Sequence, residues 1–121
     1  LVEEWPVEVI PGVSSLMACA ATLGMPLAAR NDVLTVLPAP LDDAALTARL
    51  LGCDAAAIIK VGRHFTRIRN LLERLGLTNR VRYIERATMT EQRVVAMEKV
   101  NAEGAPYFSM ILVHTRGTAW A

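Results

Sequence analysis

The stretch Val9-Ile10-Pro11-Gly12-Val13-Ser14-Ser15 decides the fold class of this chain. An apolar run that enters a Pro-Gly turn and continues into two hydroxyl residues is typical of a strand, a tight loop and a helix N-terminus. Backbone N–H groups at such a helix start can face a ligand. The same pattern occurs wherever an α/β protein turns a corner, with Ser14 serving only as the helix cap. The rest of the chain has to decide between these two interpretations.

Helical and strand patterns alternate downstream of this stretch. Apolar spacing predicts a helix over residues 14–23 that ends at Gly24, and a second helix over 64–75 that ends at Gly76. Two aspartates open a further helix over residues 42–51. Strands are expected over residues 6–10, 33–37, 55–61, 81–84, 93–97 and 107–113. The fold class is therefore α/β, a mixed sheet of five to six strands with helices packed on it, in one domain.

Composition indicates a soluble, cytoplasmic protein without a membrane partner. The chain has 121 residues and is 53% hydrophobic, but its apolar runs are too short to span a bilayer and its start lacks basic signal-peptide residues. It begins at Leu1 and enters an expected strand almost at once, so we expect a fragment of a longer protein. Cys19 and Cys53 lack metal-ligand spacing, which favours buried thiols and no metal site.

The net charge of +1 hides a strongly basic segment. Nine of the thirteen basic side chains lie within residues 60–93. A solvated helix face explains Arg67, Arg69 and Arg74, whereas an anion site explains the arginines in loops. Few aromatic residues lie among these arginines, which argues against nucleic acid and favours a small polycarboxylate or phosphate ligand. The nine are Lys60, Arg63, Arg67, Arg69, Arg74, Arg80, Arg82, Arg86 and Arg93.

Three loops that follow expected strands combine small and polar residues, at 12–15, 60–64 and 85–89. Ligands of open α/β sheets bind beyond the carboxyl ends of parallel strands, so we expect the chemistry there. His64 fits a residue at a helix start better than a general base. The sequence has no pattern of a Ser-His-Asp triad or a Gly-rich phosphate loop, and no catalytic residue is assigned.

These loops resemble those of the tetrapyrrole methylases. The resemblance extends from Val7 to Val113, and within the family it is greatest to the branch that acts on precorrin-2. Family members have two dissimilar α/β domains, and this chain resembles the C-terminal one. The Gly-rich strand end and Gly-Asp-Pro loop of the first domain do not occur in it. The segments that carry the resemblance are residues 9–15, 24–27, 29–38, 60–64, 85–89 and 105–110.

The resemblance implies methyl transfer from S-adenosylmethionine to a meso carbon of a tetrapyrrole in cobalamin biosynthesis, by a homodimer. It also gives the basic segment a purpose, because precorrin-2 carries acetate and propionate arms. The cofactor contacts that it implies fall on Ser14, Ser15, Val61, Gly62 and Ala87. The substrate contacts fall on Arg30, Arg63 and Arg86.

Two other functions stay open. One is a methylase of the same fold that acts on another tetrapyrrole carbon or on a protein side chain. The other is a non-catalytic module for dimerisation or partner binding. The isolated chain is expected to be inactive, because the first domain would supply about half of the cofactor pocket.

Overall fold

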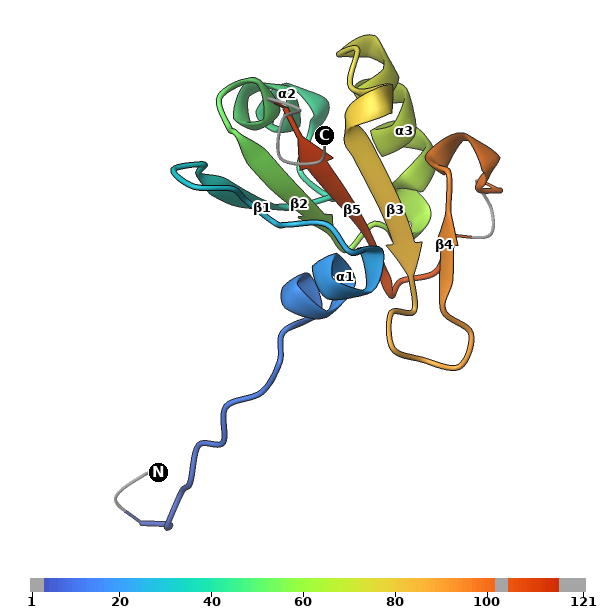
Figure 1. Ribbon diagram of the computed structural model, residues 1–121. Helices are drawn as coiled ribbons and strands as arrows, with labels where there is room; N and C mark the ends of the chain where they lie inside the picture. Colours follow the sequence, from blue (N-terminus) through green and yellow to red (C-terminus); the bar gives the residue numbers. More distant parts are fainter. Residues whose placement is uncertain (1–3, 102–104, 116–121) are drawn as a thin grey trace.

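A five-stranded mixed sheet forms the centre of the molecule (Figure 1). The computed structural model describes residues 4–101 and 105–115. Within them the strands lie in the order β1-β2-β5-β3-β4, which confirms the predicted α/β class. The strands are β1 (Leu34–Pro38), β2 (Ala55–Ile59), β3 (Val81–Glu85), β4 (Arg93–Val95) and β5 (Ser109–His114).

The directions of the strands bring three carboxyl ends to one edge of the sheet. β1 and β2 are parallel, and β5 lies antiparallel between β2 and β3, so β2 and β3 run in the same direction. β4 adds to β3 in the antiparallel sense. The loops that leave β2 and β3 therefore flank the start of β5. We call this edge the carboxyl edge.

Short polar caps define where the first two helices begin. The Ser14 hydroxyl accepts a hydrogen bond from the Met17 N–H at 3.4 Å, and the Asp42 carboxylate accepts one from the Ala45 N–H at 2.7 Å. Gly24 ends the first helix in the left-handed conformation at φ 67°, as its position predicts. The helices are α1 (Ser15–Leu23), α2 (Asp43–Leu51) and α3 (Phe65–Arg74), with 3-10 turns η1 (Gly62–His64), η2 (Thr78–Arg80) and η3 (Met97–Lys99). Within the described ranges, no helix is long and apolar enough to cross a membrane.

Two apolar clusters cover the two faces of the sheet. On one face, Phe65 and Leu72 of α3 pack with Tyr83 of β3, and the Phe65 and Tyr83 rings meet edge to face at 5.3 Å. On the other face, Cys19 of α1 packs with Ile84 of β3. The alternation of Tyr83 and Ile84 follows the pleat of β3. Both cysteines are free and buried, as predicted.

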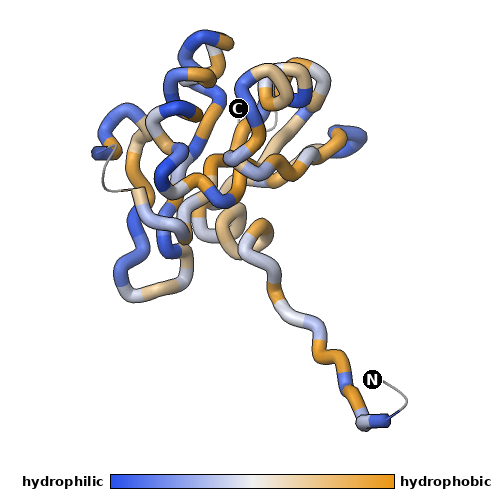
Figure 2. The backbone as a smooth tube through the Cα atoms, turned by 180° about the vertical axis from the view of Figure 1, so that it is seen from behind, coloured by the Kyte–Doolittle hydropathy of each residue, from blue (hydrophilic) through white to orange (hydrophobic). Residues whose placement is uncertain are grey.

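The expected strand over residues 6–10 is wrong. This segment is an extended arm that runs away from the sheet, and Figure 1 shows it projecting below α1. Its apolar residues, orange in Figure 2, are highly exposed: Val7 is 61%, Val9 86% and Ile10 78% exposed. The apolar pattern suits a strand, but a strand needs a neighbour for its backbone hydrogen bonds. No strand of the described residues pairs with the arm.

Three other predicted strands are shorter than expected, and the one over residues 107–113 begins only at Ser109. The segment 55–61 ends as a strand at Ile59, because Lys60 adopts a left-handed conformation with φ 58°. The segment 93–97 ends at Val95, and Met97 begins the turn η3 instead. The sequence pattern predicts that these segments are apolar, but it does not predict the left-handed residue or the 3-10 turn that ends two of them.

The arginines of α3 do not form a simple solvated face. Arg67 donates hydrogen bonds to the carbonyls of Ala39 and Leu41 and to the Asp43 carboxylate, so it ties α3 to the start of α2. Arg69 donates to the Val100 carbonyl at 3.0 Å. The solvated-face interpretation is therefore wrong for both residues. It holds for Arg74, whose side chain is 65% exposed.

Arg67→Met should lower the free energy of unfolding by about 1–3 kcal/mol, because two backbone carbonyls lose their donor. Arg74→Met is the matched control, and its effect should stay within about 0.5 kcal/mol because its ion pair is exposed. Urea unfolding of both variants measures the difference. Equal effects of the two substitutions would contradict the role given to Arg67.

Candidate functional site at the carboxyl edge

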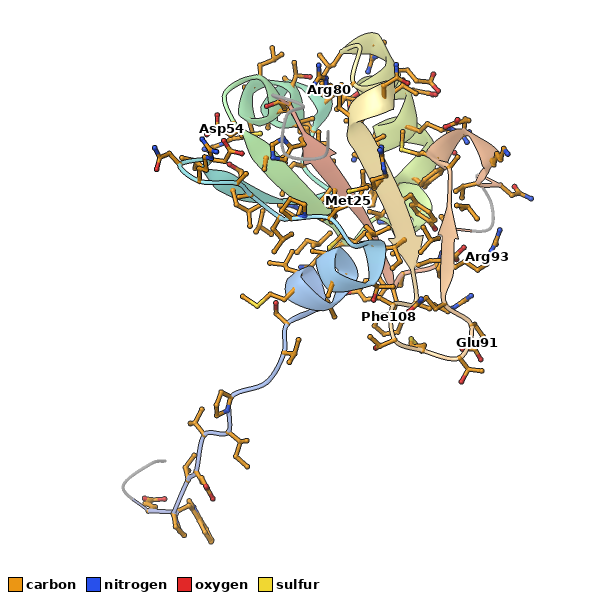
Figure 3. All side chains as sticks on the ribbon, in the orientation of Figure 1. Met25, Asp54, Arg80, Glu91, Arg93 and Phe108 are labelled. Carbon is orange, nitrogen blue, oxygen red and sulfur yellow. The ribbon has the colours of Figure 1, made fainter. Side chains whose placement is uncertain are left out.

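A cavity of about 470 Å³ opens at the carboxyl edge, between α1 and the loops that follow β2 and β3. Figure 3 shows the labelled Phe108 at this edge, beside α1. Four segments far apart in the sequence meet here because β5 starts between the ends of β2 and β3. The lining residues are Val13, Ser15, Ala18, Cys19, Ile59, Lys60, Arg86, Ala87, Thr88, Met89, Tyr107, Phe108, Ser109 and Met110.

The α1 side of the cavity is made of small and apolar groups. Ser15 lies in the first turn of α1, with Ala18 and Cys19 in the next. Cys19 is 5% exposed, and burial raises the pKa of its thiol, so it stays protonated near neutral pH. The thiol therefore acts as a small apolar group. This side offers close contact to an apolar ligand surface, and polar groups only at the helix start.

Three lining residues hold a backbone conformation that side chains rarely adopt. Lys60, Arg86 and Thr88 have φ values of 58°, 50° and 66°. Hydrogen bonds fix two of them: the Arg86 N–H donates to the Phe108 carbonyl at 2.7 Å, and the Thr88 N–H donates to the Gln92 side chain at 2.7 Å. Left-handed non-glycine residues are uncommon and cluster at functional sites. The cavity is therefore a strong candidate for the functional site.

A buried carboxylate lies under the rim of the cavity. Glu85 is 2% exposed and lies 3.2 Å from Arg93 and 4.0 Å from Arg86. Burial, and then the charge of Glu85, raise the pKa of Tyr83 to about 12, so this phenol remains protonated at physiological pH. Within residues 4–101 and 105–115, no group of three or more His, Cys, Asp or Glu side chains is placed to hold a metal ion.

The structure brings part of the predicted cofactor set together. Ser15 of α1 and Ala87 of the loop after β3 both line the cavity. Ser14 lies beside it as the cap of α1. Val61 is fully buried in the core. Gly62 lies close to the backbone of Tyr107, and a Cβ added to it would lie 3.7 Å from the Tyr107 Cα. Neither of these last two residues is part of the lining.

Of the predicted substrate arginines, only Arg86 lines the cavity. Arg30 is exposed, in the turn that precedes β1. Arg63 lines a separate hollow over α3, together with Arg67. His64 also lies on that side, where burial and then the charges of Arg67 and Arg63 lower its pKa.

Sequence reasoning assigns no role to three lining residues, Lys60, Tyr107 and Phe108. Lys60 directly follows β2 in the loop 60–64, where the end of a strand predicts chemistry, but the sequence assigns no individual role to it. The aromatic pair precedes an antiparallel strand, and no rule on strand ends points to it. Only the insertion of β5 between β2 and β3 brings the pair to the cavity.

The family model described as Tetrapyrrole (Corrin/Porphyrin) Methylases matches residues 1–100. The chain belongs to the tetrapyrrole methylase family. Precorrin-2 C(20)-methyltransferase of Sinorhizobium sp. is 41% identical over 113 residues, which are 93% of this chain and 46% of the relative. Cobalt-precorrin-2 C(20)-methyltransferase of Salmonella typhimurium is 36% identical over 113 residues, 92% of this chain and 47% of the relative. The chain thus spans about half the length of these relatives.

Solved structures of the tetrapyrrole methylase family share the fold. Uroporphyrin-III C-methyltransferase from Thermus thermophilus, complexed with S-adenosyl homocysteine, has a TM-score of 0.58 at 28% identity. The match covers 93% of this chain and 54% of that protein. Cobalt precorrin-4 methyltransferase, a cobalamin biosynthetic enzyme, has a TM-score of 0.68 at 19% identity, over 93% of this chain and 54% of that protein, and shows the fold alone.

Proposed function

We propose that this tetrapyrrole methylase chain is part of an enzyme of cobalamin biosynthesis that methylates carbon 20 of precorrin-2. The similarity to precorrin-2 C(20)-methyltransferase along nearly the whole chain carries the proposal. The methyl donor is S-adenosylmethionine, and the related uroporphyrin-III methyltransferase complexed with S-adenosyl homocysteine supports this choice. The product of the proposed reaction is precorrin-3A.

The cavity at the carboxyl edge fits such a cofactor chemically. Ser14 and Ser15 would hold polar cofactor atoms through hydroxyls and helix-start amides. Ala87 leaves room for a ring to approach the backbone, and Val61 and Gly62, which the resemblance also assigns to the cofactor, follow the lining residue Lys60 in the chain. When bound, S-adenosylmethionine supplies the methyl group from its sulfonium. The residues of this chain align the two reactants and exclude water, effects that contribute up to ~7–11 kcal/mol in favourable cases.

The chain is the C-terminal domain of this enzyme, and a first domain supplies the other part of the pocket. Its length, about half that of its relatives, supports this division. The exposed apolar arm, with Val7, Val9 and Ile10, supports it too, because large apolar exposure marks a contact surface. The family resemblance also favours a cytoplasmic homodimer that acts on a tetrapyrrole and not on nucleic acid or membranes.

The isolated chain should fold but should give no heat of binding with micromolar S-adenosylmethionine. Under the proposal the first domain supplies the rest of the pocket, so this chain alone buries too little of the ligand. Titration calorimetry on the isolated chain and on the full-length protein makes the comparison. Micromolar binding by the isolated chain would contradict the division of the pocket between two domains.

In the full-length protein, Ala87→Leu should weaken S-adenosylmethionine binding by about 1–3 kcal/mol, roughly five- to 150-fold, because the added volume fills space that the ligand needs. Folding should be preserved, since Ala87 lies in a loop at the cavity. The control is Ala44→Leu, at an exposed position of α2. Calorimetry should show unchanged affinity for the control, and unchanged affinity in Ala87→Leu would remove Ala87 from the site.

Two arginines at opposite ends of β3 test the proposed substrate contact. Arg86 follows β3 at the cavity, whereas Arg80 precedes it, and Figure 3 shows the labelled Arg80 far from Phe108. Arg86→Gln should weaken precorrin-2 binding about tenfold or more and leave cofactor binding nearly intact, because it removes a charge-assisted contact of about 1.5–3 kcal/mol.

Arg80→Gln is the matched control and should change tetrapyrrole affinity little. Arg30→Gln and Arg63→Gln belong in the same binding series, since the resemblance places substrate contacts on them as well. Equal small effects at all four positions would favour a solvated basic face. Equal large effects that added salt suppresses would indicate long-range attraction instead.

A further inference from the structure

We propose that Lys60 and the aromatic pair Tyr107–Phe108 form, together with Arg86, a subsite for a planar ligand whose rim carries carboxylates. The inference rests on the proposed function and extends it. It places the tetrapyrrole against Lys60, Tyr107 and Phe108, to which the family resemblance gives no role. All four residues line the cavity at the carboxyl edge.

The two cations occupy equivalent places in the sheet. Lys60 follows β2 and Arg86 follows β3, the parallel strands on either side of β5. Both residues have left-handed backbones, a conformation in which glycine avoids the steric cost of a side chain. A long cationic side chain at each place therefore lowers stability relative to glycine. An anion bound between the two cations would offset this cost.

The described carboxylates near the two cations do not balance their charge. Lys60 is exposed, and none of the described carboxylates forms an ion pair with it. Arg86 lies 4.0 Å from Glu85, while Arg93 lies 3.2 Å from the same carboxylate. The Glu85 carboxylate is thus attracted more strongly to Arg93 than to Arg86. Lys60 and Arg86 leave net positive charge at the cavity, which suits a ligand with several carboxylates.

The aromatic pair is exposed but its backbone is fixed. Tyr107 is 64% and Phe108 63% exposed, and their rings meet edge to face at 5.4 Å. The Phe108 carbonyl accepts from the Arg86 N–H, and the Ser109 hydroxyl donates to the Pro106 carbonyl at 2.7 Å. Two large aromatic rings held at a cavity rim provide apolar surface for a flat conjugated ring.

The combination of cations and aromatic rings favours one class of ligand. A purely apolar protein segment would cover Tyr107 and Phe108 but would gain nothing from Lys60 and Arg86. A small phosphate or carboxylate would use the cations but would leave the rings exposed. A planar polycarboxylate uses both, with its rim at the cations and its face or edge against the rings.

The experiment measures uroporphyrin binding to the full-length protein by fluorescence titration, and S-adenosyl homocysteine binding separately by calorimetry. Uroporphyrin is a planar tetrapyrrole with carboxylates around its rim. The variants are Lys60→Met, Lys60→Arg, Lys60→Gly, Tyr107→Leu and Phe108→Leu. Lys99→Met is the matched control, because Lys99 is the other lysine of the sequence and lies in η3, outside the cavity lining. Thermal melting checks that each variant folds.

Lys60→Met should weaken uroporphyrin binding about tenfold or more and leave S-adenosyl homocysteine binding unchanged. Lys60→Arg should retain most of the affinity because it keeps the charge. Lys60→Gly should bind as weakly as Lys60→Met but melt at or above the temperature of the parent protein, since the backbone strain is relieved. Each aromatic variant should weaken uroporphyrin binding several-fold, and Lys99→Met should behave as the parent.

Unchanged uroporphyrin affinity in Lys60→Met would overturn the subsite, and so would equal loss of both ligands, which assigns Lys60 to the cofactor. Aromatic variants that melt lower but bind uroporphyrin normally would show that another part of the protein covers the pair, and would also overturn it. A parent protein that binds S-adenosyl homocysteine but not uroporphyrin defeats this inference alone. A parent protein that binds neither ligand defeats the proposed function as well.

Discussion

The antiparallel insertion of β5 between β2 and β3 is the constraint on which the cavity depends. Its ladders hold the ends of two parallel strands at a fixed spacing, with the start of β5 between them. The Arg86 N–H bond to the Phe108 carbonyl continues the β3–β5 ladder by one step and joins two walls of the cavity. α1 covers the same edge because its small residues pack on the β3 face that carries Ile84. Four segments that are distant in the sequence thus meet at the cavity.

Local sequence patterns predict most helices and strands of this fold, but they do not predict which segments pair to form the sheet. The apolar spacing of α3, the Asp42 cap and the glycine after α1 act within a few residues, so their structure follows from the sequence alone. The arm at residues 6–10 has an equally good strand pattern but finds no partner strand in the described residues. Pairing is a long-range property, which a local pattern cannot supply.

The candidate site likewise has residues that the sequence predicts and residues that it does not. Ser15, Arg86 and Ala87 follow from their loops and from the family resemblance, and the structure gathers them at one cavity. The loop of Lys60 is also predicted, but the role of Lys60 itself and that of the pair Tyr107–Phe108 are not, for different reasons. The backbone conformation of Lys60 is unusual for lysine, so residue type gives no hint of it. The aromatic pair reaches the cavity only through the strand order, which depends on contacts between residues far apart in the chain.

Glu85 explains why Arg86 and Arg93 have different roles. A carboxylate that is 2% exposed is costly unless a cation lies close to it, and Arg93 meets this need at 3.2 Å across the β3–β4 pair. The pairing register places Arg93 directly opposite Glu85, so the contact follows from the sheet itself. Arg86, one residue after Glu85, lies beyond the last residue pair of β3 and β4. Its left-handed conformation turns the chain toward the cavity rim. Because Arg93 provides the close cation for Glu85, the charge of Arg86 remains available to a ligand.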